Sequence, residues 1–179
     1  MSIRVEHISY IYGKGSPFEK TALDDVDLTI EKGEFIGIIG HTGSGKSTLI
    51  QHLNGLIHPT CGKVTIDGVD LAEKSKAAVA KRHSVGMVFQ YPEHQLFEET
   101  VAKDIAFGPM NLGCDEEEAG KRVKSAMKFA GLDYDTFAGR SPFRLSGGQQ
   151  RRVAIAGVIA MHPDFLVKKI GRASCRERV

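Results

Sequence analysis

Residues Gly40–Ser47 read GHTGSGKS and match the pattern G-x-x-x-x-G-K-[ST], which is typical of loops that hold the phosphates of a nucleotide. Glycines at three positions allow the backbone to curl, so that several N–H groups converge on the β- and γ-phosphates. Lys46 would place a positive charge beside the terminal phosphates, and the hydroxyl of Ser47 would bind Mg²⁺. The pattern therefore predicts a site for a nucleoside triphosphate and Mg²⁺.

The flanking residues supply the elements that such a loop needs, a strand before it and a helix after it. The apolar stretch Glu34–Ile39 predicts the strand, and Ser47–Asn54 predicts a helix whose dipole adds positive potential at the loop. The alternative to a phosphate-binding loop is a glycine-rich turn that contains a lysine by chance, and the flanking elements argue against it. For His41, exposure to solvent on the loop surface is favoured over a contact with the nucleotide. The expected nucleotide contacts are Gly40, His41, Thr42, Gly43, Ser44, Gly45, Lys46, Ser47 and Thr48.

A second motif, LSGGQ at Leu145–Gln149, precedes a largely apolar helical stretch that runs to Met161. Ser146 is suited to cap this helix, and the two glycines leave the N–H groups of its first turn open to a phosphate. Taken alone, the motif could be an ordinary capped helix start. Together with the upstream loop it predicts a second set of nucleotide contacts, which are Ser146, Gly147, Gly148 and Gln149.

The two motifs in one chain resemble the nucleotide-binding domain of ATP-binding-cassette (ABC) proteins. The resemblance implies an α/β fold, with a P-loop NTPase (RecA-like) core, an antiparallel β subdomain and a helical subdomain at about residues 92–142. It also implies a head-to-tail dimer in which the LSGGQ helix of one subunit covers the ATP of the other. The sequence pattern predicts strands at Ile3–Tyr12, Thr21–Ile30 and Ser84–Gln90, and a turn, strand and turn at Thr60–Gly68. It predicts helices at Val101–Phe107 and Asp115–Gly131, and a short helix or a linker at Ser75–Arg82.

The resemblance also assigns an aromatic residue that stacks on the adenine ring. Tyr12 falls at this position, and Tyr10 is the alternative. We prefer Tyr12 because it alternates with Ile8 and Ile11, which we expect to be buried. Stacking needs only a flat ring face and is worth about 1–3 kcal/mol per base.

Gln90 ends the predicted strand Ser84–Phe89 and matches the family's glutamine that links the γ-phosphate and Mg²⁺ to a transmembrane partner. The resemblance therefore implies Lys46 and Gln90 as catalytic residues, and Ser47 and Gln90 as metal ligands.

Two stretches near Gln90, FQYPEHQLF at Phe89–Phe97 and TVAKDIAFGP at Thr100–Pro109, are similar to the ATPases of energy-coupling-factor (ECF) importers of vitamins and metal ions. SPFEK at Ser16–Lys20 and the pair His41-Thr42 resemble the second of two ATPase paralogues in such complexes. The implied partners are a second ABC ATPase subunit, a membrane coupling subunit that contacts Gln90–Phe97, and a separate substrate-binding membrane subunit. Leu96 and Phe97 would be exposed to receive the coupling subunit; the alternative is that both pack within the chain.

The end of the sequence departs from the family pattern. The family continues the strand after Val167 with one apolar residue and then Asp-Glu-Pro, whereas Lys168 and Lys169 are expected to interrupt the strand here. The sequence IGRASCRERV follows, which resembles the translation of a sequencing-library adapter. We therefore expect residues 1–167 to be the N-terminal two-thirds of an ABC domain and 168–179 to be a non-native tail; a genuine but divergent C-terminus is the alternative. Without the family's acidic pair and switch histidine, this chain is expected to lack hydrolysis, which leaves a binding-only cassette as an alternative function.

Composition narrows the remaining classes. The chain has 24 basic and 22 acidic residues, and without residues 168–179 it has 19 and 21, so charge gives no argument for nucleic-acid binding. A soluble ABC ATPase that acts on DNA or ribosomes is a further alternative, but the chain has neither two cassettes nor a coiled-coil insertion. No signal peptide and no apolar run of about 18 residues is present, so we expect partner subunits to hold the protein at the cytoplasmic face of the membrane.

Overall fold

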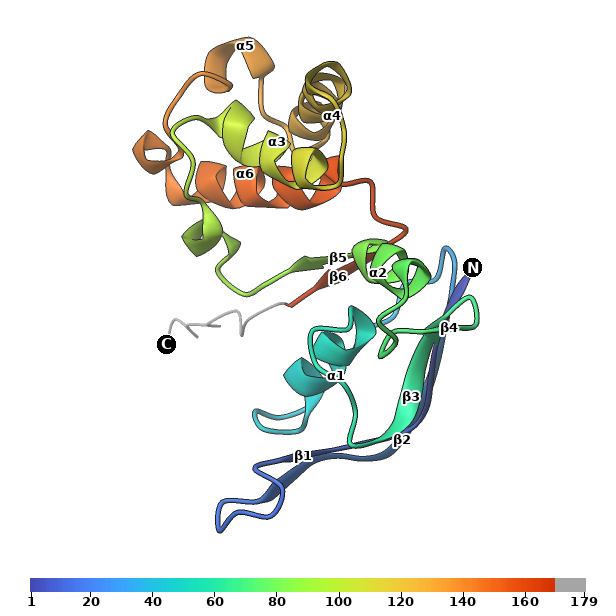
Figure 1. The fold of residues 1–179 in the computed structure, drawn as a ribbon. Helices are drawn as coiled ribbons and strands as arrows, with labels where there is room; N and C mark the ends of the chain where they lie inside the picture. The colour runs from blue at the N-terminus through green and yellow to red at the C-terminus, as the bar shows by residue number, and fades with distance from the viewer. Residues whose placement is uncertain (170–179) are drawn as a thin grey trace, which may run out of the picture. The chain divides into compact units, whose positions relative to one another are not determined.

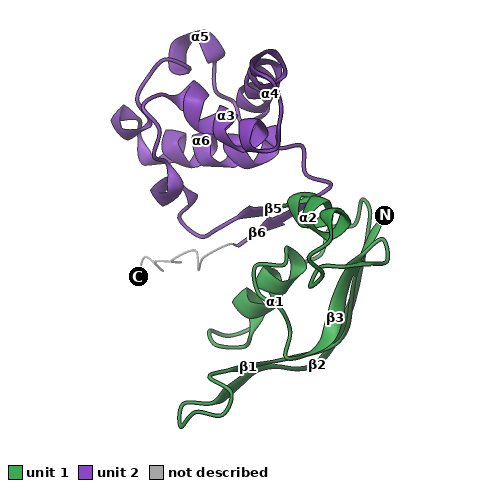
Figure 2. Ribbon diagram, in the orientation of Figure 1, with its two compact units in different colours: residues 1–85 green, residues 86–179 purple. Residues whose placement is uncertain are grey.

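The structure is a computed structural model that describes residues 1–169, so most of the expected non-native tail lies outside the described residues. The chain divides into two compact units, residues 1–85 and residues 86 onward (Figure 2).

The first unit contains an antiparallel sheet with the strand order β2-β1-β3-β4 (Figure 1). Alternating apolar side chains, among them Ile3, Val5, Ile8 and Ile66, are buried along its strands. The sheet confirms the predicted antiparallel layer, and register shifts in β1 mark β-bulges between Val5 and Ile11. The strands are β1 (Ser2–Tyr12), β2 (Lys20–Glu31), β3 (Cys61–Ile66) and β4 (Val69–Asp70).

Two helices complete the first unit, α1 (Lys46–Leu53) and α2 (Lys76–His83). Helix α1 contacts β2 and buries Leu49 and Leu53. The side chain of Ser75 accepts a hydrogen bond from the N–H of Ala78 and caps α2. Helix α1 lies where the sequence predicts it, and α2 shows that the stretch read as a short helix or a linker is a helix.

The second unit is mainly helical, with α3, α4 and α6 packed together (Figure 1). The buried apolar side chains of these helices form one cluster. Its largest fully buried side chains include Ile105, Met127 and Val153, one from each of these helices. The helices are η1 (Pro92–Gln95), α3 (Val101–Asn111), α4 (Glu116–Phe129), α5 (Tyr134–Phe137), η2 (Pro142–Arg144) and α6 (Gly147–Ala160). Two short strands, β5 (Val85–Val88) and β6 (Phe165–Lys168), pair in a second sheet.

Two strand expectations were wrong in detail. Residues Glu34–Ile39 pair with none of the described strands, and the Phe35 and Ile39 side chains are 100% and 93% exposed. A strand forms only where its N–H and C=O groups find a neighbouring strand, which apolar pattern alone does not supply. Conversely, Lys168 does not interrupt β6: it is the last residue of the strand and its side chain is exposed, so no buried charge arises.

Candidate nucleotide-binding site

The phosphate-loop pattern, Gly40–Ser47, lies on an exposed turn that leads directly into α1. Gly43 and Gly45 have φ angles of +85° and +83°, which side chains other than glycine rarely adopt. A Cβ atom on Gly45 would lie 2.4 Å from the carbonyl oxygen of Ala22, in β2. Glycine at 45 therefore allows both the turn and the close approach of the loop to the sheet.

The ammonium group of Lys46 lies against the loop itself. Its Nζ donates hydrogen bonds to the carbonyl oxygens of Gly40 (2.7 Å) and His41 (2.6 Å) and to Oγ of Ser44 (3.1 Å). A phosphate held by the loop amides would meet this positive charge at close range.

The start of α1 fits an anion. Its N-cap is Gly45, which offers no side chain to the first-turn N–H groups, and the first turn carries no acidic residue. The side chain of Ser47 is exposed and makes no hydrogen bond among the described residues, so its hydroxyl is accessible to a metal ion. The loop thus fits a triphosphate, whereas the carboxylates usual at Mg²⁺ sites are not part of it.

Tyr12 is positioned beside this loop. Its hydroxyl lies 3.1 Å from Oγ1 of Thr48, the residue after the loop, and its side chain is 43% exposed. Tyr10 packs edge-on against the ring of Tyr12 (centroids 4.8 Å apart) and also against the buried ring of His52 (5.0 Å). Tyr12 therefore has the more accessible ring of the two.

The alternation argument for Tyr12 was only partly correct. Ile8 is buried as expected, but Ile11 is only half-buried. The β-bulges in β1 shift the side-chain alternation there, and sequence pattern alone does not reveal them.

The LSGGQ motif lies at the start of α6, in the second unit. Ser146 and Gln149 form a capping box: the N–H of Ser146 donates to Oε1 of Gln149 (2.9 Å), and the N–H of Gln149 donates to Oγ of Ser146 (3.4 Å). A Cβ atom added to Gly147 or Gly148 would meet no atom within 4 Å. The two polar side chains therefore stabilise the helix start, and the glycines leave its surface open.

Gln90 follows β5 and is half-buried, and the left-handed backbone of Tyr91 (φ 58°) turns the chain into η1. Leu96 and Phe97, the apolar pair after η1, differ in exposure. Leu96 is buried in the helical core, whereas Phe97 is 56% exposed and packs edge-on against Phe107. The expectation that both are exposed was wrong for Leu96, because its side chain belongs to the apolar cluster of the helical unit.

The expected site residues divide between the units. Tyr12 and residues 40–48 belong to the first unit, and Gln90 and residues 146–149 belong to the second. Sequence reasoning missed an ion pair near the second group, Glu93 with Arg151, since 58 residues separate the partners. It also missed the exposed cluster of His7, Asp25 and Asp27, where Nδ1 of His7 lies 2.9 Å from Oδ1 of Asp25, because the three residues meet only across β1 and β2.

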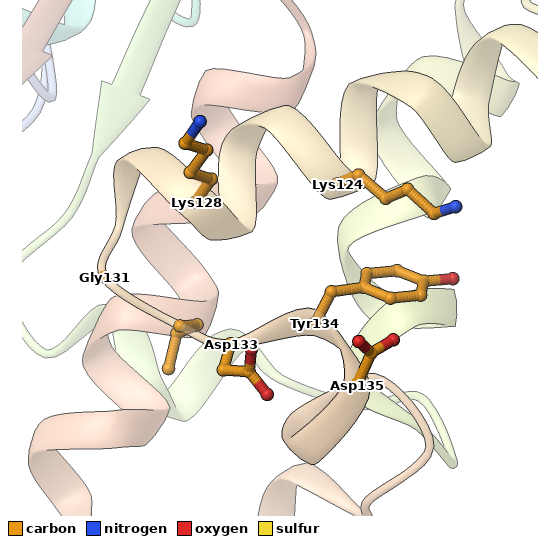
Figure 3. A pocket seen from close by; sticks show the side chains of 7 residues that line it. Lys124, Lys128, Gly131, Asp133, Tyr134 and Asp135 are labelled. Carbon is orange, nitrogen blue, oxygen red and sulfur yellow. The ribbon is translucent and has the colours of Figure 1, made fainter.

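A hollow of about 540 Å³ in the second unit contains none of the expected site residues (Figure 3). Nζ of Lys124 lies 5.1 Å from the centre of the Tyr134 ring at its edge. The hollow is shallow, and its mixed charges do not single out a ligand. It is lined by Lys124, Lys128, Gly131, Leu132, Asp133, Tyr134 and Asp135.

Comparison with known proteins identifies the class. The family model described as "ABC transporter" matches residues 23–168. Solved ABC cassettes have the same fold: cbiO1 of Clostridium perfringens, titled part of the ABC transporter complex cbiONQ, is similar with a TM-score of 0.78 and 38% identity over 93% of this chain and 64% of that one. The dimeric cassette MJ0796 bound to ADP and Pi is similar with a TM-score of 0.78 and 32% identity, over 93% of this chain and 72% of that one. The chain therefore belongs to the ABC transporter ATPase family and has its P-loop NTPase fold.

Curated relatives narrow the branch. The chain is 59% identical to the energy-coupling factor transporter ATP-binding protein EcfA2 of Clostridium tetani and 61% identical to EcfA2 of Clostridium acetobutylicum. Each match covers 93% of this chain and 58% of the relative, so the chain spans less than two-thirds of their length. These names confirm the resemblance to ECF importer ATPases. Among residues 1–169, no helix is both long and apolar enough to cross a membrane.

Proposed function

We propose that the protein is an ATP-binding subunit that energises an ECF-type importer of vitamins or metal ions. The observation that carries ATP binding is the loop at residues 40–47, which combines left-handed glycines, a start of α1 without a side-chain cap, and the ammonium group of Lys46. The combination of a glycine-rich loop, a helix N-terminus and a cation suits the triphosphate of ATP.

The adenine is proposed to stack on Tyr12. The Tyr12 ring is accessible, and the Tyr12 hydroxyl contacts Thr48, the residue directly after the loop. Tyr10, the alternative, contacts the buried ring of His52 as well as the ring of Tyr12. Tyr12 thus combines a partly exposed ring with proximity to the loop.

Two ATPase subunits are proposed to enclose ATP head to tail, with Ser146–Gln149 of one over the loop of the other. The open surface at Gly147 and Gly148 supports a contact with phosphate across the interface. In a relative, MJ0796, the cassette is described as dimeric.

A membrane coupling subunit is proposed to contact the Gln90–Phe97 segment and to hold the protein at the cytoplasmic face of the membrane. The exposed Phe97 and Phe107 rings, 4.8 Å apart, offer an apolar surface beside the acidic Glu98 and Glu99. A separate membrane subunit would bind the transported substrate.

Hydrolysis requires Mg²⁺, which polarises the γ-phosphate when bound. Ser47 and Gln90 are the proposed ligands of this ion in the whole protein. In this chain, Lys168 and Lys169 follow Val167 where the family resemblance implies acidic residues. We therefore propose that this 179-residue chain binds ATP without hydrolysing it.

The test is phosphate release by the protein extended to the full length of its relatives and purified with co-expressed membrane partners. We expect MgATP hydrolysis that Lys46→Ala abolishes, whereas Lys32→Ala, which removes an exposed lysine outside the loop, leaves it unchanged. Turnover equal to wild type in the Lys46 variant, or steady turnover by the 179-residue chain, would contradict this proposal.

A further inference from the structure

One ion pair connects two segments of the second unit that are distant in sequence. The guanidinium group of Arg151 donates two hydrogen bonds to the carboxylate of Glu93, from Nη2 to Oε1 (3.0 Å) and from Nε to Oε2 (3.3 Å). This two-bond arrangement fixes the direction as well as the distance between the groups.

The positions of the two residues are informative. Glu93 lies in η1, three residues after Gln90, and Arg151 lies in α6, two residues after Gln149. The pair therefore joins the segment proposed to contact the membrane subunit with the helix proposed to cover ATP. Both residues belong to one compact unit, and η1 packs on α6.

The pair also differs from its neighbours. The other ion pairs described in this unit, such as Lys121 with Glu117, join residues four apart in sequence, an arrangement that is worth little when exposed. The Glu93 side chain is only 15% exposed, although Arg151 is 53% exposed. Its hydrogen bond with Arg151 lowers the pKa of Glu93 below the ordinary range, so the carboxylate remains charged at neutral pH.

We infer that Glu93 and Arg151 are positioning residues, which make η1 and the start of α6 move as one body. A displacement of the Gln90–Phe97 segment by the membrane subunit would then displace the LSGGQ motif over the partner's nucleotide. The inference rests on the proposed function, since it needs both a membrane partner and a nucleotide. The inference requires that η1 and the start of α6 be directly linked and be displaced together, because a shared displacement would couple the membrane contact to the nucleotide contact.

The experiment compares the kcat and KM for MgATP of the full-length ATPase pair alone and in complex with its membrane subunits in lipid nanodiscs. The kcat of the complex divided by the kcat of the ATPase pair alone, called the kcat ratio, measures how strongly the membrane subunits affect hydrolysis. The variants are Glu93→Gln, Arg151→Gln and the exchange Glu93→Arg with Arg151→Glu. Lys121→Gln, which breaks the pair with Glu117 on α4, is the matched control.

We expect each single variant to move the kcat ratio toward one by at least about fivefold, with an unchanged KM for ATP and an unfolding temperature like that of the control. The exchange variant restores the ion pair in reverse and should recover much of the ratio. A wild-type ratio in both single variants would overturn the inference. The inference would also be overturned if the kcat ratio changed only in variants with a lower unfolding temperature and the exchange variant did not recover it. A wild-type complex without ATP hydrolysis would instead contradict the proposed function itself.

Discussion

At the scale of single residues, Gly45 combines two constraints that can be separated. Alanine at 45 would have a strained φ of +83° and a Cβ atom 2.4 Å from the Ala22 oxygen, whereas alanine at Gly33 would have a strained φ of +87° and no atom within 4 Å. We expect Gly45→Ala to lower the free energy of unfolding by about 2–4 kcal/mol and Gly33→Ala by about 1 kcal/mol. Denaturant titration measures both. Equal losses would show that the approach of the loop to β2 is not tight.

His52, in the middle of α1, should make stability depend on pH. Its ring is buried, Nδ1 donates to the Thr48 carbonyl (2.7 Å), and Nε2 has no partner among the described residues. Burial lowers the pKa of His52 below 6.5, although the hydrogen bond to Thr48 opposes this. The unfolded chain therefore binds the proton first, and stability falls as pH drops from about 6.5 through the folded pKa.

The measurement is the unfolding free energy from about pH 8 to about pH 5 for wild type and His52→Leu. We expect the loss below pH 6.5 to be smaller in the variant. His7 acts in the opposite direction: its hydrogen bond to Asp25 and the charge of Asp27 raise its pKa, so its stabilisation is present at low pH and lost as pH rises. A profile that His52→Leu leaves unchanged would contradict the assignment to His52.

At the scale of elements, sequence pattern was reliable where local interactions decide. Ser75, Asp115 and Ser146 each cap the helix that the sequence places after them, because the cap acts within one turn. The pattern failed at Glu34–Ile39, where a strand depends on a distant neighbour, and at Leu96, whose burial depends on helices far along the chain. Likewise, the loop and LSGGQ residues could be named from motifs, but the contacts of Tyr12 and Glu93 required the structure.

The division between Leu96 and Phe97 can be tested directly. Leu96→Ala removes a side chain from the helical core and should cost about 2–5 kcal/mol of unfolding free energy. Phe97→Ala loses mainly its edge contact with Phe107 and should cost about 1 kcal/mol, yet it should reduce co-purification with the membrane subunits. Phe97→Ala with undiminished co-purification would contradict the proposed docking surface.

At the scale of the whole molecule, the proposed site residues are shared between two units. The first unit alone carries the loop, Lys46 and Tyr12, and the second carries Gln90 and the LSGGQ helix. We therefore expect the loop to bind nucleotide measurably in the absence of the membrane partner. Binding is the property on which every other part of the account depends.

The most direct test is the affinity of the purified chain for ATP, measured by titration with a fluorescent ATP analogue and competition by unlabelled ATP. Lys46→Ala removes the cation at the loop, and we expect the affinity to fall by about tenfold or more, since hydrogen bonds to charged groups are worth about 1.5–3 kcal/mol. Lys32→Ala should bind ATP like wild type. Equal affinities for wild type and Lys46→Ala, or no competition by ATP, would contradict the account.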